Sequence, residues 1–130
     1  MSEGGLWVVE VEPEVRQWLA GLADREHTQV ERYADRLSQE GPRMPMPRSR
    51  PLGGGLYELR FHLGDDDIRI PYWFAPDCRA VLLTVFRKTR MNEETEVARA
   101  RKAQQICREQ HPPAREHAVH SRTIEGGDRS

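Results

Sequence analysis

Two short segments of alternating sequence on either side of a turn constrain the fold of this chain more than any other feature. In residues 56–62 (LYELRFH), apolar side chains alternate with charged ones that include Arg60. In residues 68–74 (IRIPYWF), Arg69 occupies the face opposite to the aliphatic residues. Successive strand residues point to opposite faces, and the intervening Gly-Asp-Asp is typical of a turn. The pattern therefore predicts an antiparallel hairpin with one apolar and one charged face.

The predicted hairpin brings two arginines together. If His62 pairs with Asp67 across the turn, Arg60 lies directly opposite Arg69. Like charges that face each other across two strands lower the stability of a sheet. A phosphate bound between the two guanidinium groups would offset that cost, because arginine presents forked donors to phosphate oxygens. The alternative is an ordinary surface network in which the arginines pair with nearby acidic residues, namely Glu58, Asp65, Asp66 and Asp67.

Composition narrows the class of protein. A chain of 130 residues with 37% hydrophobic and 32% charged residues is expected to form one soluble domain. No apolar run is long enough to span a membrane, and Cys78 and Cys107 lack metal or redox spacing, so we expect a reduced, cytoplasmic protein. Residues 43–90 contain nine basic and five acidic side chains, whereas residues 1–42 contain four and nine. Positive charge therefore concentrates around the hairpin, as a phosphate-binding face requires.

The first third of the chain predicts a strand followed by two helices. Residues 6–11 (LWVVEV) are rich in strand-forming residues, and Pro13 is well suited to the first turn of a helix. Apolar residues at helical spacing predict a second helix over residues 25–40, which Gly41 ends. Residues 42–51 contain four prolines, so we expect a stiff connector that is neither helix nor central strand.

The remainder of the chain predicts a third strand of the antiparallel meander and a last helix. Residues 80–86 form an apolar run broken only by Thr84, which is typical of a central strand covered on both faces. Asn92 is a good N-cap for a helix that reaches about Arg108. The apolar side of that helix is thin, so we expect it to lie at the sheet edge or to be partly mobile. We expect one domain over residues 1–110 and a polar, disordered tail over residues 111–130.

Three segments resemble the RelE/HigB superfamily of bacterial toxins, and most closely its phage-derived HigB-like branch. They are residues 50–61 (RPLGGGLYELRF), residues 69–72 (RIPY) and residues 81–89 (VLLTVFRKT), and the resemblance extends over residues 6–108. It implies an α+β, RelE-like fold. In that fold, an N-terminal strand and a helical hairpin pack on an antiparallel sheet of about four strands, followed by a C-terminal helix.

The resemblance also implies a function. Most members of the superfamily are toxins of type II toxin–antitoxin systems that cleave mRNA on the ribosome and thereby inhibit translation. A cognate antitoxin, usually a helix-turn-helix protein in the HigB branch, holds them inactive. The expected partners are therefore an antitoxin, the ribosome and mRNA, without a membrane. No cofactor or metal is expected, and the acidic triplet at residues 65–67 lacks metal-ligand spacing.

Cleavage of RNA through its 2′-OH needs a base, positive charge at the phosphate and an acid for the leaving 5′-oxygen. Arg60 and Arg69 fit the charge-stabilising role, and Arg87 or Lys88 at the end of the next strand completes the cluster. His62 shares the face of Arg60 and is the first candidate for the base. Lys88 is the second, because neighbouring cations ease the loss of its proton. The sequence leaves the acid and the base unassigned.

Other basic and aromatic residues are candidates for RNA binding rather than catalysis. Arg48, Arg50 and Arg90 are expected to help dock RNA or the ribosome. Trp73 shares the predicted face of Arg69 and could stack on a nucleotide. Two other functions stay open at this point. One is a non-enzymatic, ParE-like gyrase poison, and the other is a degenerate member that acts only as the antitoxin's partner in operator binding.

Overall fold

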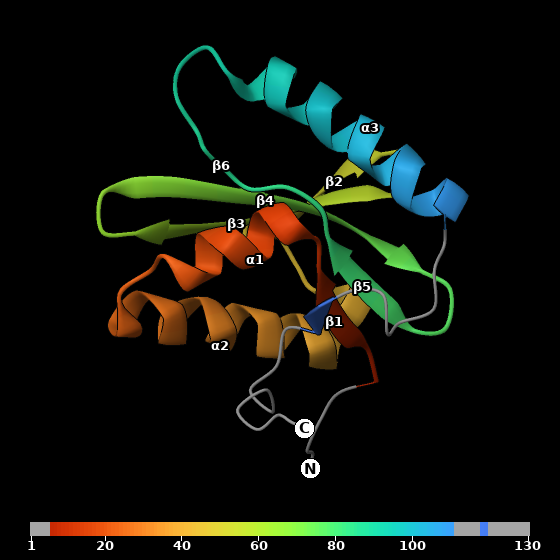
Figure 1. Cartoon of the computed structure of the whole chain (residues 1–130), viewed down its shortest axis with the longest axis horizontal. Coiled ribbons are helices and arrows are strands. Elements are labelled where there is room, and N and C mark those ends of the chain that lie inside the picture. Colours follow the sequence, from red (N-terminus) through yellow and green to blue (C-terminus); the bar gives the residue numbers. More distant parts are fainter. Residues whose placement is uncertain (1–5, 111–117, 120–130) are drawn as a thin grey trace.

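The computed structural model describes residues 6–110 and 118–119 (Figure 1). These residues form three α-helices, one short 3-10 helix and seven strands. The elements in chain order are β1 (Val8–Val11), α1 (Pro13–Ala20), α2 (Asp24–Glu40), η1 (Gly41–Arg43), β2 (Ser49–Gly53), β3 (Leu56–Leu63), β4 (Asp66–Ala75), β5 (Arg79–Leu82), β6 (Phe86–Arg87), α3 (Glu93–Gln110) and β7 (Ala118–Val119).

The strands form one mixed sheet in the order β2-β3-β4-β5-β1-β7, and β6 pairs with β4 beside this path. Strands β2 to β5 are antiparallel neighbours, and β3, β4 and β5 form the predicted three-strand meander. The N-terminal strand does not lie apart from them, because β1 pairs with β5 in parallel. The helical hairpin of α1 and α2 carries the chain from β1 to the far edge at β2. The α+β class is confirmed, but the sheet is larger than four strands and is not wholly antiparallel.

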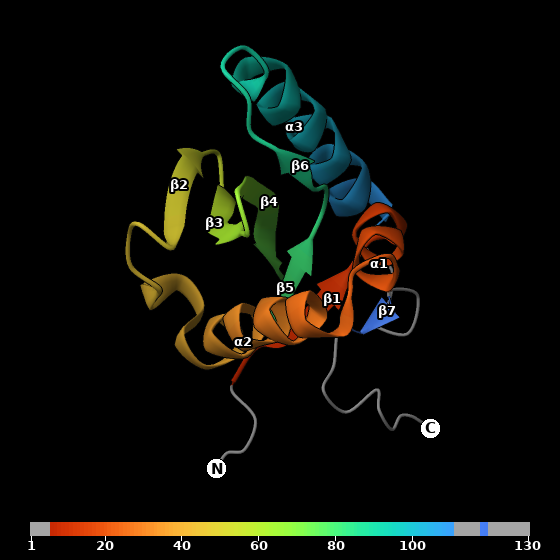
Figure 2. The same cartoon turned by 90° about the vertical axis from the view of Figure 1, so that its left-hand side faces the viewer.

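Helices cover both faces of the sheet. Figure 2 shows α2 on one side of the strands and α3 on the other, and α1 packs in the same core as α2. The first core lies under α1 and α2, where Leu19 and Leu37 pack with Phe61 and Tyr72. The second core lies under α3 and includes Leu56, Trp73, Val81, Ala100 and Cys107. Because β3 and β4 contribute alternate residues to the two cores, their charged face is sandwiched beneath α3 rather than open along its length.

The register of the β3–β4 hairpin is the one that the sequence predicts. His62 lies opposite Asp67, and Arg60 lies directly opposite Arg69. The turn between the strands includes Gly64, whose φ of 60° lies in the left-handed region that glycine adopts without strain. The hairpin therefore brings the two arginines to the same point on one face of the sheet.

The connector predicted over residues 42–51 is partly wrong, because Ser49 already begins strand β2. Pro51 lies opposite Tyr57 within this strand. Proline lacks an N–H, but an edge strand needs donors on one side only. Since β2 is at the edge of the sheet, it accommodates the proline that made a strand improbable in the sequence.

The single strand predicted over residues 80–86 is divided in two. Strand β5 ends at Leu82, and the next three residues leave the regular ladder before β6 begins at Phe86. The Leu83 N–H still donates to the Pro71 carbonyl at 2.9 Å, whereas the Val85 N–H donates to the Glu14 carboxylate at 3.1 Å. The Glu14 carboxylate of α1 therefore accepts the Val85 N–H, and the regular pairing with β4 ends here.

Helix α3 covers a face of the sheet rather than its edge, which corrects the expectation drawn from its thin apolar side. Polar contacts supplement its small apolar surface. Arg101 donates to the carbonyls of Leu52 and Gly53 at 2.5 and 3.0 Å, and Gln104 donates to the Gly54 carbonyl at 3.1 Å. Asn92 precedes the helix as predicted, but its side-chain oxygen accepts from the Thr89 N–H at 2.9 Å.

Most of the predicted tail lies outside the described residues. Its described part, β7, pairs with Glu10 and Val11 of β1 in antiparallel orientation. The division at residue 110 and the disorder of the tail stay predictions.

Among the described helices, none has the length and apolar character that crossing a membrane requires.

Gly41 should be sensitive to substitution because it ends α2 with a φ of 55°. A methyl group at this position would meet the Trp7 indole ring. We expect Gly41→Ala to lower the free energy of unfolding by about 1–3 kcal/mol through overpacking and backbone strain. Urea denaturation measures this change. Gly21→Ala is the matched control, since Gly21 has a φ of −89° and ordinary space around it. An equal loss in both variants would contradict the argument.

Candidate active site

The charged side chains of the hairpin gather on the α3 side of the sheet, near the first turn of that helix. Strand pairing places Arg50 of β2 opposite Glu58 of β3, and Arg60 of β3 opposite Arg69 of β4. Lys88 joins them because its N–H donates to the Asp67 carbonyl at 2.8 Å, beside β4. We refer to Arg50, Arg60, Arg69 and Lys88 as the basic cluster.

Glu58 lies at the centre of the basic cluster. Its Oε1 atom is 3.1 Å from Nη1 of Arg69 and 3.8 Å from Nε of Arg60. The residue is fully buried, and its Oε2 atom has no hydrogen-bond partner among the described residues. Burial raises the pKa of the Glu58 carboxyl above its usual value, Arg69 opposes this rise, and the nearby Glu93 carboxylate adds to it. Glu58 is thus a fully buried carboxyl group with one oxygen that has no partner among the described residues.

Arg69 is engaged on all sides by carboxylates. Its Nε and Nη2 atoms donate to the two oxygens of Asp67 at 3.0 and 3.1 Å, while Nη1 donates to Glu58. The hydrogen bond from Arg69 is the main cause of the lowered pKa of Asp67. Arg69 is only 4% exposed, so the guanidinium group is held in a fixed position. The network of arginines and acidic residues that the sequence left open is therefore present, and it offsets the repulsion between Arg60 and Arg69.

Glu93, the first residue of α3, spans the open side of the cluster. Its two carboxylate oxygens lie 3.6 Å from Nη1 of Arg50 and 3.8 Å from Nζ of Lys88. A carboxylate that bridges two cations in this way occupies the position that a phosphate group would take on the same cations. The helix terminus therefore supplies an internal anion to the basic cluster.

The structure brings together four of the five residues predicted to be catalytic. Arg60, Arg69 and Lys88 belong to the basic cluster, and His62 lies at its exposed margin, opposite Asp67. Arg87 is separated from them. It lies opposite Ile68 and therefore projects from the other face of the sheet, where its Nη1 atom is 3.5 Å from the Asp66 carboxylate. Of the two alternatives for completing the cluster, the structure selects Lys88.

The residues predicted to bind RNA are more dispersed. Arg50 lies within the basic cluster, and Arg90 is exposed in the loop before α3. Arg48 lies on the opposite face, where its guanidinium group stacks over the Tyr33 ring at 4.7 Å. Trp73 shares the face of Arg69 as predicted, but it is 6% exposed beneath α3. Its ring packs against Arg108 at 5.0 Å and is not accessible for stacking on a nucleotide in this structure.

Sequence reasoning missed Glu58 as a functional candidate and considered it only as a charge partner. The signal that could have identified it is its place on β3, where alternation puts it on the face of Arg60, two residues away. Its burial depends on α3, whose position the sequence did not predict.

Within residues 6–110 and 118–119, no group of three or more histidine, cysteine or acidic side chains is placed to hold a metal ion.

Comparison with solved structures identifies a similar fold. An arginine double mutant of the Escherichia coli toxin RelE in its free state is similar over 73% of this chain and 93% of the RelE chain, with a TM-score of 0.53 and 14% sequence identity. This similarity establishes a RelE-like fold. No curated protein matches the sequence.

The family is established by the sequence itself. The profile of the phage-derived protein Gp49-like (DUF891) family matches residues 17–108, which include α2, all of the hairpin and nearly all of α3. The chain belongs to this family, which is part of the RelE/HigB toxin superfamily. A toxin of this superfamily implies an antitoxin as its partner.

Proposed function

We propose that this chain is the toxin of a type II toxin–antitoxin system and cleaves mRNA on the ribosome without a metal ion. The observation that carries the proposal is the position of Glu58. Its partner-free Oε2 atom lies in a site where two arginines stand within 4 Å of its Oε1 atom. Such a site combines a proton acceptor with positive charge for a phosphate. A helix-turn-helix antitoxin is the expected inhibitor, and action on ribosomes implies a cytoplasmic location.

In the proposed reaction, the RNA 2′-oxygen attacks the adjacent phosphorus atom and the bond from phosphorus to the 5′-oxygen breaks. Once Glu93 has left the cluster and the buried Glu58 is exposed, Glu58 Oε2 takes the proton from the 2′-OH. The raised pKa of Glu58 makes its carboxylate a stronger base than an exposed one. Arg60 and Lys88 stabilise the charge that develops on the phosphate, and Arg69 holds Glu58 in place. The products are a 2′,3′-cyclic phosphate and a 5′-hydroxyl end.

The leaving 5′-oxygen requires a proton, and we assign His62 to this role. His62 is exposed at the margin of the cluster, where RNA can reach it. The electrostatic effect of His62 contributes to the lowered pKa of Asp67, so imidazole and carboxylate act on each other. Histidine is the side chain that most often serves as a general acid or base in enzymes. This assignment changes the role of His62 from the base considered in the sequence to the acid.

Glu93 must leave Arg50 and Lys88 before a phosphate can bind to them. We expect Glu93→Gln to increase the affinity for RNA by up to about fivefold, because partly exposed ion pairs contribute about 0.2–1 kcal/mol. The affinity is measured by titration of a labelled RNA in which every 2′-OH is methylated, so that cleavage cannot occur. Glu96→Gln is the control, since Glu96 is in the same helical turn but pairs with Arg99. Unchanged affinity in Glu93→Gln would show that Glu93 does not compete with RNA.

The function is tested with purified ribosomes that carry a defined mRNA. We expect the chain to produce new 5′ ends within the translated region, with 2′,3′-cyclic phosphate on the upstream fragments. Arg60→Ala should remove these ends, because removing one electrostatic interaction with the transition state typically lowers the rate by ~10²–10³-fold. Growth arrest in cells with DNA-damage signalling and intact mRNA would instead support a gyrase poison. Absence of growth arrest would support a degenerate toxin.

A further inference from the structure

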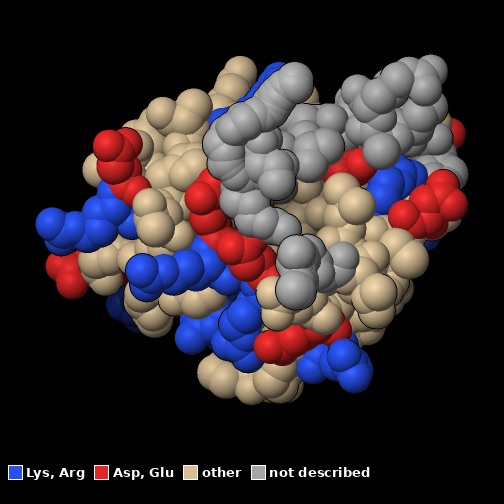
Figure 3. Space-filling model, turned by 90° about the horizontal axis from the view of Figure 1, so that it is seen from below, with Lys and Arg blue, Asp and Glu red and all other residues tan. Residues whose placement is uncertain are grey.

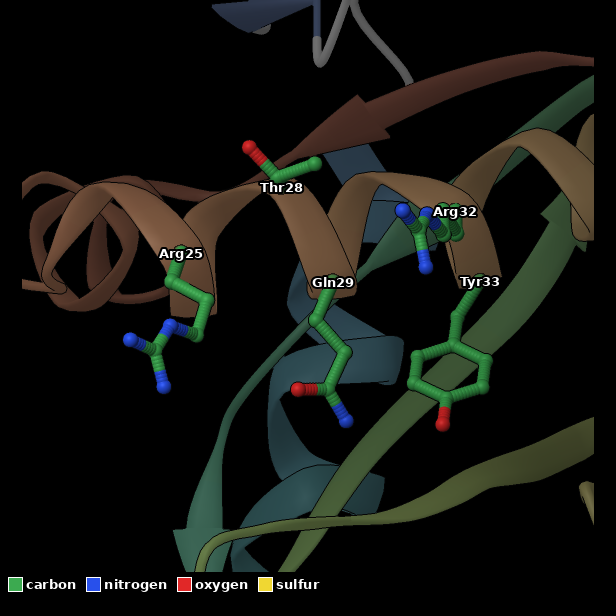
Figure 4. Close-up of a pocket in the computed structure, with 5 residues that line it drawn as sticks. All are labelled: Arg25, Thr28, Gln29, Arg32 and Tyr33. Carbon is green, nitrogen blue, oxygen red and sulfur yellow. The ribbon is translucent and has the colours of Figure 1, made fainter.

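A second basic concavity lies on the opposite face of the sheet, along α2. It has a volume of about 530 Å³ and is lined by Arg25, Thr28, Gln29, Arg32 and Tyr33, which we call the α2 groove. Figure 4 shows the side chains of Arg25, Gln29 and Tyr33 projecting from the same side of the helix toward the strands. Their spacing of four residues places them one turn apart along that side.

The α2 groove is lined by two arginines, Arg25 and Arg32. Within the described part of the chain, neither Arg25 nor Arg32 forms an ion pair, whereas Arg36 on the same helix pairs with Glu40 at 3.1 Å. Figure 3 shows basic side chains gathered beside acidic ones on the side of the molecule where α2 lies in Figure 1. Unpaired arginines beside a concave surface favour an anionic ligand.

Arg48 extends this charge to the edge of the groove. Its guanidinium group stacks over Tyr33, and its Nη1 atom donates to the Arg60 carbonyl at 2.8 Å. The Nε atom of Arg48 is buried and lacks a hydrogen-bond partner among the described residues. A buried donor without a partner is costly unless a ligand or water accepts from it.

Two residues of β3, Arg60 and His62, connect the basic cluster with the surroundings of the α2 groove. Gln29 donates to the His62 carbonyl at 2.9 Å, and Arg48 donates to the Arg60 carbonyl. The side chain of Arg60 belongs to the basic cluster on the other face of the sheet, and that of His62 lies at the margin of the cluster. Strand β2 pairs with β3 only as far as Leu59, so Arg48 flanks the edge of β3 at Arg60. One ligand could therefore pass from the cluster around this edge into the groove.

We propose that the α2 groove binds the phosphate backbone of single-stranded RNA, as a continuation of the strand whose scissile phosphate lies in the basic cluster. The inference rests on the proposed function and extends it with a second RNA-binding surface. Arg25 and Arg32 bind phosphates, and Thr28 and Gln29 hydrogen-bond to ribose or base. An antitoxin helix is a poorer fit, because a helix docked in a groove needs apolar anchors and the lining has no aliphatic residue.

The test measures binding by fluorescence anisotropy with a labelled, fully 2′-O-methylated 12-nucleotide RNA across a range of salt concentrations. We expect Arg25→Ala/Arg32→Ala to weaken binding by roughly tenfold. The slope of log affinity against log salt should also become shallower by about 0.7 for each phosphate that the variant no longer binds. Arg16→Ala/Arg43→Ala is the matched control, because it removes two exposed arginines outside the groove and leaves the net charge equal. Circular dichroism verifies that both variants fold.

Equal affinity and equal salt dependence in the two double variants would overturn the proposal. Displacement of the RNA by an acidic peptide of equal charge, with the same sensitivity to Arg25→Ala/Arg32→Ala, would also overturn it in favour of a protein partner. The outcome is separate from the test of function. If Arg25→Ala/Arg32→Ala weakens RNA binding while the wild-type chain does not cleave mRNA on ribosomes, the RNA-binding role of the groove is upheld. Only the enzymatic function is then rejected.

Discussion

Glu58→Gln should abolish RNA cleavage while leaving the protein folded. The amide cannot accept the 2′-OH proton, and loss of a general base typically lowers the rate by ~10²–10⁴-fold. The substitution keeps the size of the side chain and an oxygen that can accept from Arg69. Because burial raises the pKa of Glu58, a neutral group at this position avoids part of the cost of burying charge. Single-turnover cleavage on ribosomes that carry a defined mRNA measures the effect.

The dependence of the rate on pH gives an independent test of the same role. A base acts in its deprotonated form, so the wild-type rate should rise with pH through the pKa of Glu58, which lies above 4.5. The residual rate of Glu58→Gln should lack this rise. Asp66→Asn is the control, because Asp66 pairs with Arg87 on the other face of the sheet and should retain the wild-type profile. A Glu58→Gln variant with wild-type rate would remove Glu58 from the mechanism.

Arg69→Ala should destabilise the fold far more than Arg60→Ala. Removal of Arg69 leaves the buried Glu58 carboxyl without its closest partner, and breaking such a pair costs about 3–5 kcal/mol. Arg60 is 27% exposed and its Nε atom is 3.8 Å from Glu58, so its loss should cost about 1 kcal/mol or less. Urea denaturation of the two single variants measures both values. Similar losses in both would show that Arg69 is not the structural arginine of the pair.

The ion pair between Arg69 and Asp67 predicts that Arg69→Ala differs from the wild type in its stability at acidic pH. The folded-state pKa of Asp67 is lowered by Arg69, so Asp67 stabilises the fold above its unfolded pKa and loses this contribution as the pH falls through the folded value. In Arg69→Ala, this part of the acid-dependent loss should be absent. A variant lacking both arginines is therefore a poor test of catalysis, because it can lose activity through unfolding. Arg60→Ala separates the two effects.

The hairpin was predictable because its determinants are local. Alternation assigns a face to each side chain, and the Gly-Asp-Asp turn fixes which residues lie opposite each other. Together they placed Arg60 opposite Arg69, which the structure confirms. The same rule could not separate Arg87 from Lys88, because the chain leaves the regular ladder between Leu82 and Phe86 and periodicity is lost over this interval.

The position of α3 was not predictable from periodicity. Arg101 and Gln104 dock this helix by hydrogen bonds to carbonyls of the glycine turn between β2 and β3. Hydropathy does not report such hydrogen bonds, so the helix appeared too polar to cover a sheet. The error extended to the site, because α3 buries Trp73 and its first residue reaches the basic cluster. The position of α3 thus decides which residues of the charged face are exposed.

The bridge from Glu93 to Arg50 and Lys88 has a consequence for selectivity. Glu93 belongs to the same chain as its cationic partners, so it competes with any incoming anion as a tethered ligand whose effective concentration is of the order of millimolar or more. A single phosphate ion makes too few contacts to displace the Glu93 carboxylate readily. A polymer that engages several sites at once gains avidity and displaces the carboxylate. If the proposed function holds, the first turn of α3 therefore weakens the binding of small phosphates more than the binding of a long RNA.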